Sequence, residues 1–141
     1  MAFLLDTNVI SEFVKPEPSR RVAAWLEDQD PRDLFISSMT LGEIVRGVER
    51  MPAGRRRRAL ERWVEQDLTG EFEGHILAFD LETALLWGRI MGAADKRGRP
   101  RAAADAVIAS VARRHDLTLV TRNTRDFTGT GVKTLNPWSA R

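Results

Sequence analysis

The chain has 141 residues, of which 43% are hydrophobic and 30% charged, and its formal net charge is +2. This composition predicts one globular domain over residues 1–141. The absence of cysteine excludes disulfides, zinc–thiolate sites and cysteine nucleophiles, and only two histidines are present for a histidine-based metal site. The N-terminus resembles no targeting peptide, and no apolar run reaches the roughly 18 residues that span a bilayer, which predicts a cytoplasmic protein without membrane contact.

Short apolar runs typical of β-strands alternate along the chain with longer segments of helical spacing. The predicted strands are residues 3–5, 34–36, 76–79, 117–120 and 132–135. Apolar side chains three and four residues apart predict helices around residues 22–26, 41–48, 60–64, 81–91 and 107–111. The stripe over residues 81–91 is the longest and is expected to be buried. Strands that alternate with helices indicate an α/β fold with a mostly parallel sheet of about five strands, flanked by helices.

Polar oxygen-bearing residues follow several of these predicted strands. Asp6 ends the first strand, Glu43 follows the second, and Asn123 and Asp126 follow the fourth, while Asp105 opens the last long helix. In open α/β sheets, functional groups gather beyond the carboxyl ends of the strands. These residues are therefore expected to converge at one edge of the sheet.

Each acidic residue also has a purely structural interpretation. Thr40 and Glu43 match the spacing of a capping box, and Asp105 in a first helical turn would complement the helix dipole. Asp126 fits an ordinary turn. Asp6 is harder to explain in this way, because a carboxylate that ends an apolar strand without a cationic partner is costly to bury, and a metal ion would relieve that cost.

A cluster of oxygen ligands favours a hard cation such as Mg²⁺ or Mn²⁺. Bound divalent ions activate water and stabilise the charge that develops when a phosphodiester is cleaved. We therefore expect a metal-dependent hydrolase of phosphodiester bonds, since no other nucleophile or general base stands in a recognisable motif.

Four segments of the chain together resemble a known family, the PIN-domain nucleases, and within it the toxins of VapB–VapC toxin–antitoxin pairs. The segments are Leu4 to Glu12 (LLDTNVISE), Thr40 to Gly47 (TLGEIVRG), Ala103 to Ala109 (AADAVIA) and Val120 to Phe127 (VTRNTRDF). The closing Asn136-Pro137-Trp138 is similar to the subgroup that includes FitB-type proteins. The likeness covers nearly the whole chain, and the segments occur in the order of the family.

The resemblance implies a Rossmann-like PIN fold and a ribonuclease that depends on Mg²⁺ or Mn²⁺. It also implies a homodimer, inhibition by a cognate VapB-type antitoxin and further assembly with it. By this likeness Asp6, Glu43 and Asp105 are the metal-binding carboxylates, with Thr7 and Thr121 in support. A haloacid dehalogenase-type phosphatase fits less well, because it has a second aspartate where this chain has Asn8.

The chain departs from the family pattern at the fourth acidic position, which is Asn123. An amide can offer a carbonyl oxygen but no charge. One firmly held ion, with a second that is weak or recruited by substrate, is therefore the expectation. Asp126 would compensate if its loop turned it inward.

Basic residues suggest where RNA would run, since phosphate attracts arginine and lysine. Two clusters and one arginine near Glu43 are candidates. A solvated surface explains each cluster equally well, and for Arg46 it is the favoured interpretation. The alternative to an enzyme is a non-catalytic basic α/β module that binds nucleic acid. The candidate RNA-binding residues are Arg46, Arg55, Arg56, Arg57, Arg58, Lys96, Arg97 and Arg99.

Overall fold

The structure is a computed structural model that describes residues 1–139. The strands are β1 (Phe3–Leu5), β2 (Leu34–Ser37), β3 (Ile76–Leu77), β4 (Thr118–Val120) and β5 (Thr134–Leu135). The helices are α1 (Thr7–Ser11), α2 (Arg20–Glu27), α3 (Ser38–Glu49), α4 (Arg55–Arg62), α5 (Thr69–Glu71), α6 (Leu81–Lys96) and α7 (Ala103–Arg114). A π-helical segment (Trp63–Leu68) joins α4 to α5, and 3₁₀ turns cover Glu12–Val14, Pro31–Asp33 and Thr124–Phe127.

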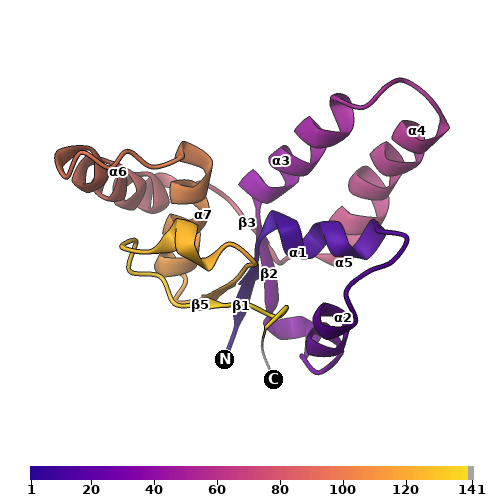
Figure 1. The fold of residues 1–141 in the computed structure, drawn as a ribbon, viewed down its shortest axis with the longest axis horizontal. Coiled ribbons are helices and arrows are strands. Elements are labelled where there is room, and N and C mark those ends of the chain that lie inside the picture. The colour runs from indigo at the N-terminus through magenta and orange to yellow at the C-terminus, as the bar shows by residue number, and fades with distance from the viewer. Residues whose placement is uncertain (140–141) are drawn as a thin grey trace.

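The strands form one parallel sheet in the order β3-β2-β1-β4-β5, which confirms the predicted fold class. Since β1 lies at the centre and the chain winds outward in both directions, the strand order reverses between β1 and β4. Parallel strands also bring all their carboxyl ends to the same edge, from which the chain leaves β1 and β2 for α1 and α3 (Figure 1). Crevices at such a reversal are the usual ligand sites of open α/β sheets.

Alternate side chains of the strands enter two separate cores, as the period of two in a strand requires. Phe3 and Leu5 pack with α1, α2, α3 and the π-helical segment on one face. Leu4 and Leu119 pack with α7 and Phe127 on the other face. The sheet is thus covered on both sides, which explains the apolar runs that mark its strands.

The strands differ from their predicted bounds mainly at the outer positions. β3 ends at Leu77 because only Ile76 and Leu77 pair with β2, and the chain then turns to Asp80, which caps α6. Phe79, predicted within that strand, is 43% exposed. β4 and β5 begin one and two residues later than predicted, at Thr118 and Thr134.

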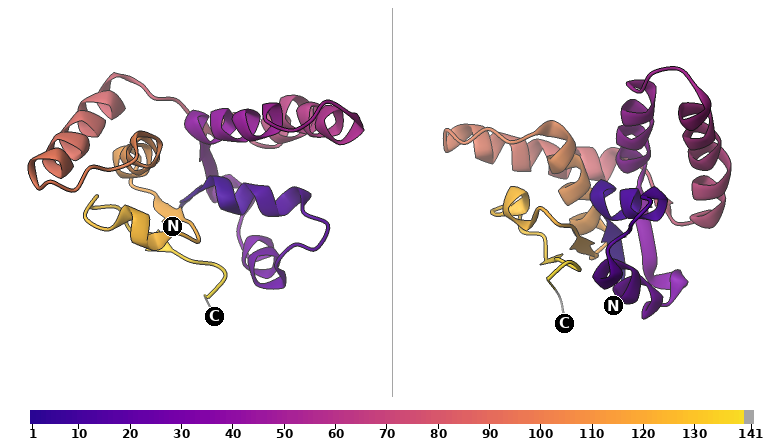
Figure 2. Two further views of the ribbon diagram at one scale, coloured as in Figure 1. Left: turned by 45° about the horizontal axis from the view of Figure 1, so that its top comes forward. Right: turned by 45° about the vertical axis from the view of Figure 1, so that its right-hand side comes forward.

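The predicted burial of the apolar stripe on α6 is wrong at its beginning. Ile90 is buried, but Leu81 and Leu85 are 74% and 53% exposed. Helix α6 lies at the outside of the molecule and packs mainly against α7 (Figures 1 and 2), so the side chains of Leu81 and Leu85 on its other face stay exposed.

The structure does not contain the capping box that was the structural alternative for Thr40 and Glu43. Helix α3 begins at Ser38, and its N-cap is Ser37, whose hydroxyl accepts a hydrogen bond from the backbone N–H of Met39. Thr40 is therefore inside the helix and fully buried. Glu43 is left free to turn toward α1 instead of toward the helix start.

Within residues 1–139, no helix is both long and apolar enough to cross a membrane.

Candidate active site

Asp6 lies at the point where the strand order reverses. It follows β1 directly, is only 7% exposed, and caps α1 by accepting a hydrogen bond from the backbone N–H of Thr7 at 2.8 Å. Its second oxygen, Oδ2, accepts a hydrogen bond from the hydroxyl of Thr121, also at 2.8 Å. Thr121 immediately follows β4, the strand paired with β1. Neither partner of the carboxylate is a cation.

The hydroxyl of Thr121 uses its full hydrogen-bonding capacity, which is one donated bond and two accepted bonds. It donates to Asp6 and accepts from the side-chain amide of Asn8 at 3.3 Å and from the backbone N–H of Asn123 at 3.1 Å. The side chain of Asn8 in turn accepts from the backbone N–H of Arg122 at 3.3 Å. This network fixes the loop after β4 against the start of α1.

Glu43 approaches the same point from α3. Its Oε1 accepts a hydrogen bond from the hydroxyl of Thr7 at 2.8 Å, so Thr7 contacts Asp6 through its backbone and Glu43 through its side chain. The structure therefore places Thr7 and Thr121 as the two hydroxyl partners of the acidic residues. These are the two positions that the sequence motifs assign to support.

The cavity at this edge of the sheet has a volume of about 370 Å³. It brings together the predicted site residues Asp6, Thr7, Glu43, Asp105 and Asn123. Asp105 is in the first turn of α7, as predicted. The same cavity is also lined by Asn8, Ser11, Glu12, Lys15, Arg122 and Trp138.

Electrostatics set this cluster apart from a set of helix caps. Burial raises the pKa of Asp105 to about 6, and repulsion from Asp6, Asp126 and Glu43 adds to the effect, while Arg101 opposes it. Burial also raises the pKa of Asp6, against the hydrogen bonds from Thr121 and Thr7 that lower it. A carboxylate that served only to complement a helix dipole would have its charged form favoured and its pKa lowered.

Asp126 lies near the cluster but not in the same cavity. It is exposed in the 3₁₀ turn Thr124–Phe127 and lines an adjoining cavity of about 530 Å³ together with Asp105. Its charge still contributes to the raised pKa values of Asp6 and Asp105. Asn123 lines the acidic cavity itself. The loop thus presents its amide to the cluster and its carboxylate to the neighbouring cavity.

Oxygen donors without a cationic partner fit a hard divalent cation by their chemistry, and their mutual repulsion is what such an ion would relieve. Across residues 1–139, however, no three acidic or histidine side chains already stand in the arrangement of a metal site. The carboxylates are gathered in one cavity, but they do not form a preassembled ligand set.

The basic residues predicted to bind RNA lie in different parts of the structure. Arg97 and Arg99 line the cavity of Asp105 and Asp126, together with Arg101 and Arg125. Arg101 serves the structure, because its guanidinium donates to the carbonyl oxygens of Asp126 and Thr128 at 2.9 and 2.8 Å. Lys96 is the exposed last residue of α6.

The arginine run begins α4 but lies apart from the carboxylates. Arg57 pairs with Glu49 at 2.7 Å and so holds α4 against α3. Arg55 and Arg56 line an apolar cavity around Trp63 that includes none of the acidic residues. Arg58 is exposed on the same helix, and Arg46 is exposed on α3, one turn beyond Glu43.

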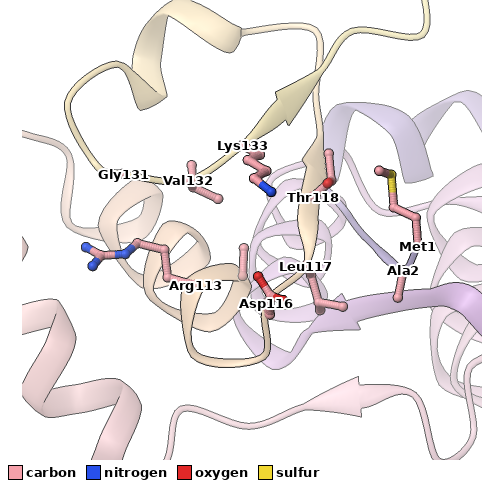
Figure 3. Close-up of a pocket in the computed structure, with 10 residues that line it drawn as sticks. Met1, Ala2, Arg113, Asp116, Leu117, Thr118, Gly131, Val132 and Lys133 are labelled. Carbon is pink, nitrogen blue, oxygen red and sulfur yellow. The ribbon is translucent and has the colours of Figure 1, made fainter.

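A further cavity, also of about 370 Å³, lies at the opposite edge of the sheet, where β1, β4 and β5 begin (Figure 3). Its charged residues are Lys133, Asp116 and Arg113. The guanidinium of Arg113 turns away from the cavity and donates to the carbonyl oxygen of Thr130 at 3.0 Å. No cluster of carboxylates faces this cavity, so the candidate active site is at the carboxyl edge.

The chain is similar to known proteins over almost its whole length. Residues 3–132 match the family model described as "PIN domain". The chain is 40% identical to Toxin FitB of Neisseria gonorrhoeae over 135 residues, which is 96% of this chain and 97% of that protein. It is 37% identical to VapC ribonuclease Y4jK of Sinorhizobium fredii, with 96% of each covered.

A solved structure, that of FitAB bound to an IR36 DNA fragment, contains a chain that superposes with a TM-score of 0.90. The sequences are 38% identical, and the match covers 99% of this chain and 97% of that chain. The strand order, the acidic cavity and these matches lead to one conclusion: the chain belongs to the PIN-domain family.

Proposed function

We propose that this protein is a metal-dependent ribonuclease that acts as the toxin of a VapB–VapC type pair and is inhibited by its cognate antitoxin. The observation that carries the proposal is the convergence of Asp6, Glu43 and Asp105 in one cavity at the reversal of strand order. Relatives named as a toxin and a ribonuclease align over almost the whole chain and support the choice of substrate.

The proposal includes Mg²⁺ or Mn²⁺ held by Asp6, Asp105 and Glu43. When bound, such an ion would lower the pKa of a water nucleophile and stabilise charge on the phosphate oxygens. Asn123 adds a neutral oxygen donor, which favours one firmly held ion over a symmetrical pair.

The residues of the chain itself have separate tasks in this scheme. Thr7 and Thr121 orient the carboxylates of Glu43 and Asp6 through hydrogen bonds of 2.8 Å, so these groups do not rotate away from substrate. Burial of Asp6 keeps bulk water from screening it. Arg97 and Arg99, beside Asp105, would bind phosphates of the RNA strand on one side of the cleaved bond.

The alternative is a basic module that binds nucleic acid without cleaving it. It requires only that the acidic residues cap helices, and the structure gives that role to Asp6 at α1. It gives no reason for the raised pKa of Asp105 or for the bond between Thr7 and Glu43. The grouping of carboxylates costs folding free energy, and catalysis supplies a reason to retain it.

The first prediction concerns cleavage. Wild-type protein should cleave RNA with Mn²⁺ or Mg²⁺ and stop when EDTA is added, and Asp6→Asn should lose at least about 100-fold in rate because a charged ligand is replaced by an amide. Denaturing gels of a labelled RNA measure both. Asp95→Asn, an exposed substitution on α6, is the control and should cleave normally. Cleavage that survives EDTA, or that persists in Asp6→Asn, would contradict a metal nuclease.

The second prediction concerns pH and stability without metal. Because the pKa of Asp105 in the folded protein is about 6, above the ordinary value near 3.9, the folded state holds this proton more tightly than the unfolded state. Metal-free protein should therefore lose stability as pH rises through this interval. Asp105→Asn removes the effect, so its melting temperature at pH above about 7 should exceed that of wild type by about 3 °C.

This shift corresponds to about 1 kcal/mol, after discounting for solvent screening of a half-exposed group. The advantage of Asp105→Asn should shrink as pH falls and approach zero below about pH 3, where both states are protonated. Thermal melts in EDTA across this range provide the measurement. A melting temperature lowered by the substitution at neutral pH would show that Asp105 is a stabilising cap.

The third prediction concerns toxicity. Production of the wild-type chain in bacteria without its antitoxin should slow growth, because uncontrolled RNA cleavage is harmful, whereas Asp6→Ala should not. Growth curves at matched protein levels, checked by immunoblot, measure the difference. Equal growth of both strains would count against the toxin role while leaving cleavage in vitro untouched. A cytoplasmic location, where RNA is accessible, belongs to the same proposal.

The fourth prediction concerns the expected homodimer. Phe79, Leu81 and Leu85 form an exposed apolar surface around the start of α6, and exposed patches of this kind often mark interfaces. Sedimentation velocity should show a dimer for wild type and a monomer for Leu85→Glu, since a buried charge without a partner opposes association. Glu82→Gln, on the same turn, is the control. A monomeric wild-type chain would overturn this part of the proposal.

A further inference from the structure

The acidic cavity has a second, positively charged wall. Lys15, Arg122 and Trp138 line it together with Asp6, Glu43 and Asp105. Lys15 follows the 3₁₀ turn after α1, Arg122 follows β4, and Trp138 lies beyond β5. Three segments far apart in the sequence thus bring two cations and an indole to the cavity that contains the carboxylates.

Arg122 is positioned by Trp138, Asn8 and Asn136, while the N–H groups of its guanidinium are free to bind a ligand. Its Cζ lies 5.2 Å from the centre of the Trp138 ring, a cation–π distance, and the side chain is exposed. Its backbone N–H donates to Asn8, and its carbonyl oxygen accepts from Asn136 at 3.5 Å. Within residues 1–139, the guanidinium itself makes no hydrogen bond or ion pair.

Trp138 is fixed as firmly as the arginine that it supports. Its backbone N–H donates to the side chain of Asn136 at 2.9 Å, and its carbonyl oxygen accepts from Arg21 of α2 at 3.1 Å. The indole also packs against the core that includes Phe3 and Val22. The platform beneath Arg122 is therefore part of the folded domain.

Glu12 balances only part of the charge of this wall. It is 4% exposed, ion-paired with Lys15, and accepts a hydrogen bond from the backbone N–H of Ser19 at 2.8 Å. One buried carboxylate faces two cations, Lys15 and Arg122, so the wall retains a net positive charge. Burial tends to raise the pKa of Glu12, but Lys15 and Ser19 outweigh it and the pKa is lowered, so the carboxylate stays charged.

The two walls are held in register by the hydrogen bonds of Thr121. Its hydroxyl donates to Asp6, accepts from Asn8, and Asn8 accepts from the backbone of Arg122. The backbone of Arg122 is thus coupled to the carboxylate of Asp6 through the side chains of Asn8 and Thr121. A polyanion that presents one phosphate to the acidic wall, through a cation, would present the next to Arg122.

We infer that Arg122, stacked on Trp138 and flanked by Lys15, is the binding site for the RNA phosphate adjacent to the one that is cleaved. The inference rests on the proposed ribonuclease function and adds a subsite to it. A planar guanidinium with unpaired N–H groups suits the oxygens of a phosphate, and the indole lowers the cost of ordering it. The occupant is RNA rather than an acidic protein segment because one phosphodiester chain presents successive phosphates, one to the cation that the carboxylates would hold and the next to Arg122.

The binding test uses the full chain carrying Asp6→Asn, so that RNA is not cut. Adding Arg122→Ala should weaken binding of a short fluorescein-labelled single-stranded RNA about tenfold. It should also reduce the slope of log affinity against log salt by about 0.7, the value for one lost phosphate contact on a single strand. Arg89→Ala removes the same charge from an exposed position on α6 and should change neither quantity.

Two further variants separate the phosphate contact from the stacking. Arg122→Lys keeps the charge and should restore the salt slope but not the full affinity. Trp138→Leu keeps an apolar group in the core and should weaken binding about threefold with the slope retained. Thermal melts test whether each variant is folded. If Trp138→Leu does not fold, the inference is decided by Arg122→Ala, because that substitution is at an exposed position.

Cleavage kinetics provide an independent readout in the chain with Asp6 intact. Arg122→Ala should raise KM about tenfold and leave kcat within about twofold, as expected for uniform binding of substrate and transition state. Unchanged RNA affinity, salt slope and KM in Arg122→Ala, while wild type cleaves RNA, would overturn the subsite and leave the ribonuclease intact. The subsite would also be overturned if Arg122→Ala weakened the binding of an acidic peptide but left the binding of RNA unchanged. A wild type that binds RNA through Arg122 but never cleaves would instead refute the catalytic proposal.

Discussion

The hydrogen bond from Thr121 to Asp6 is the contact on which the site depends. It exists because β1 and β4 are parallel neighbours in a register that pairs Leu5 with Val120, so the next residue of each strand lies side by side. Threonine fills this position well, since its single donor and two acceptor sites serve Asp6, Asn8 and the backbone of Asn123 together. A shift of one residue in register would turn every side chain of the strand to the other face and separate this pair.

The same contact explains how a domain of this size tolerates several carboxylates in one cavity. Asp6 is stabilised by two hydrogen bonds, which oppose the rise in pKa that burial causes. For Asp105, burial and then repulsion from Asp6, Asp126 and Glu43 raise the pKa to about 6, and no hydrogen bond within residues 1–139 opposes them. The cluster therefore pairs one carboxylate whose position is fixed by two hydrogen bonds with another whose pKa is raised to about 6. Such pairs are typical of sites where binding or catalysis, and not stability, determines which residues are kept.

Much of the architecture could be predicted from the sequence, because period and position are local signals. The apolar runs gave the strands to within a few residues, and the positions of Asp6 and Asp105 relative to them indicated the correct edge of the sheet. The errors come from information that is not local. Thr40 and Glu43 have capping-box spacing, but Ser37 one turn earlier begins the helix. Leu81 and Leu85 have core-like spacing, but no element covers the start of α6.

The basic residues also show the difference between what is visible locally in the sequence and what the fold brings together. An uninterrupted run such as Arg55 to Arg58 is conspicuous in a sequence, yet Arg57 is used to hold two helices together, and the run lies away from the carboxylates. Lys15, Arg122 and Trp138 are separated in the sequence, and although Arg122 and Trp138 lie within the family-like segments, nothing local indicates that they meet. The fold brings them to one wall of the acidic cavity, because β1, β4 and β5 end at the same edge and the segments that follow them meet there. In a parallel sheet, the residues just past the strands therefore have to be considered together, whatever their charge. The carboxylates at this edge indicate the chemistry of the site. The cations beside them determine how an anionic chain could bind next to those carboxylates.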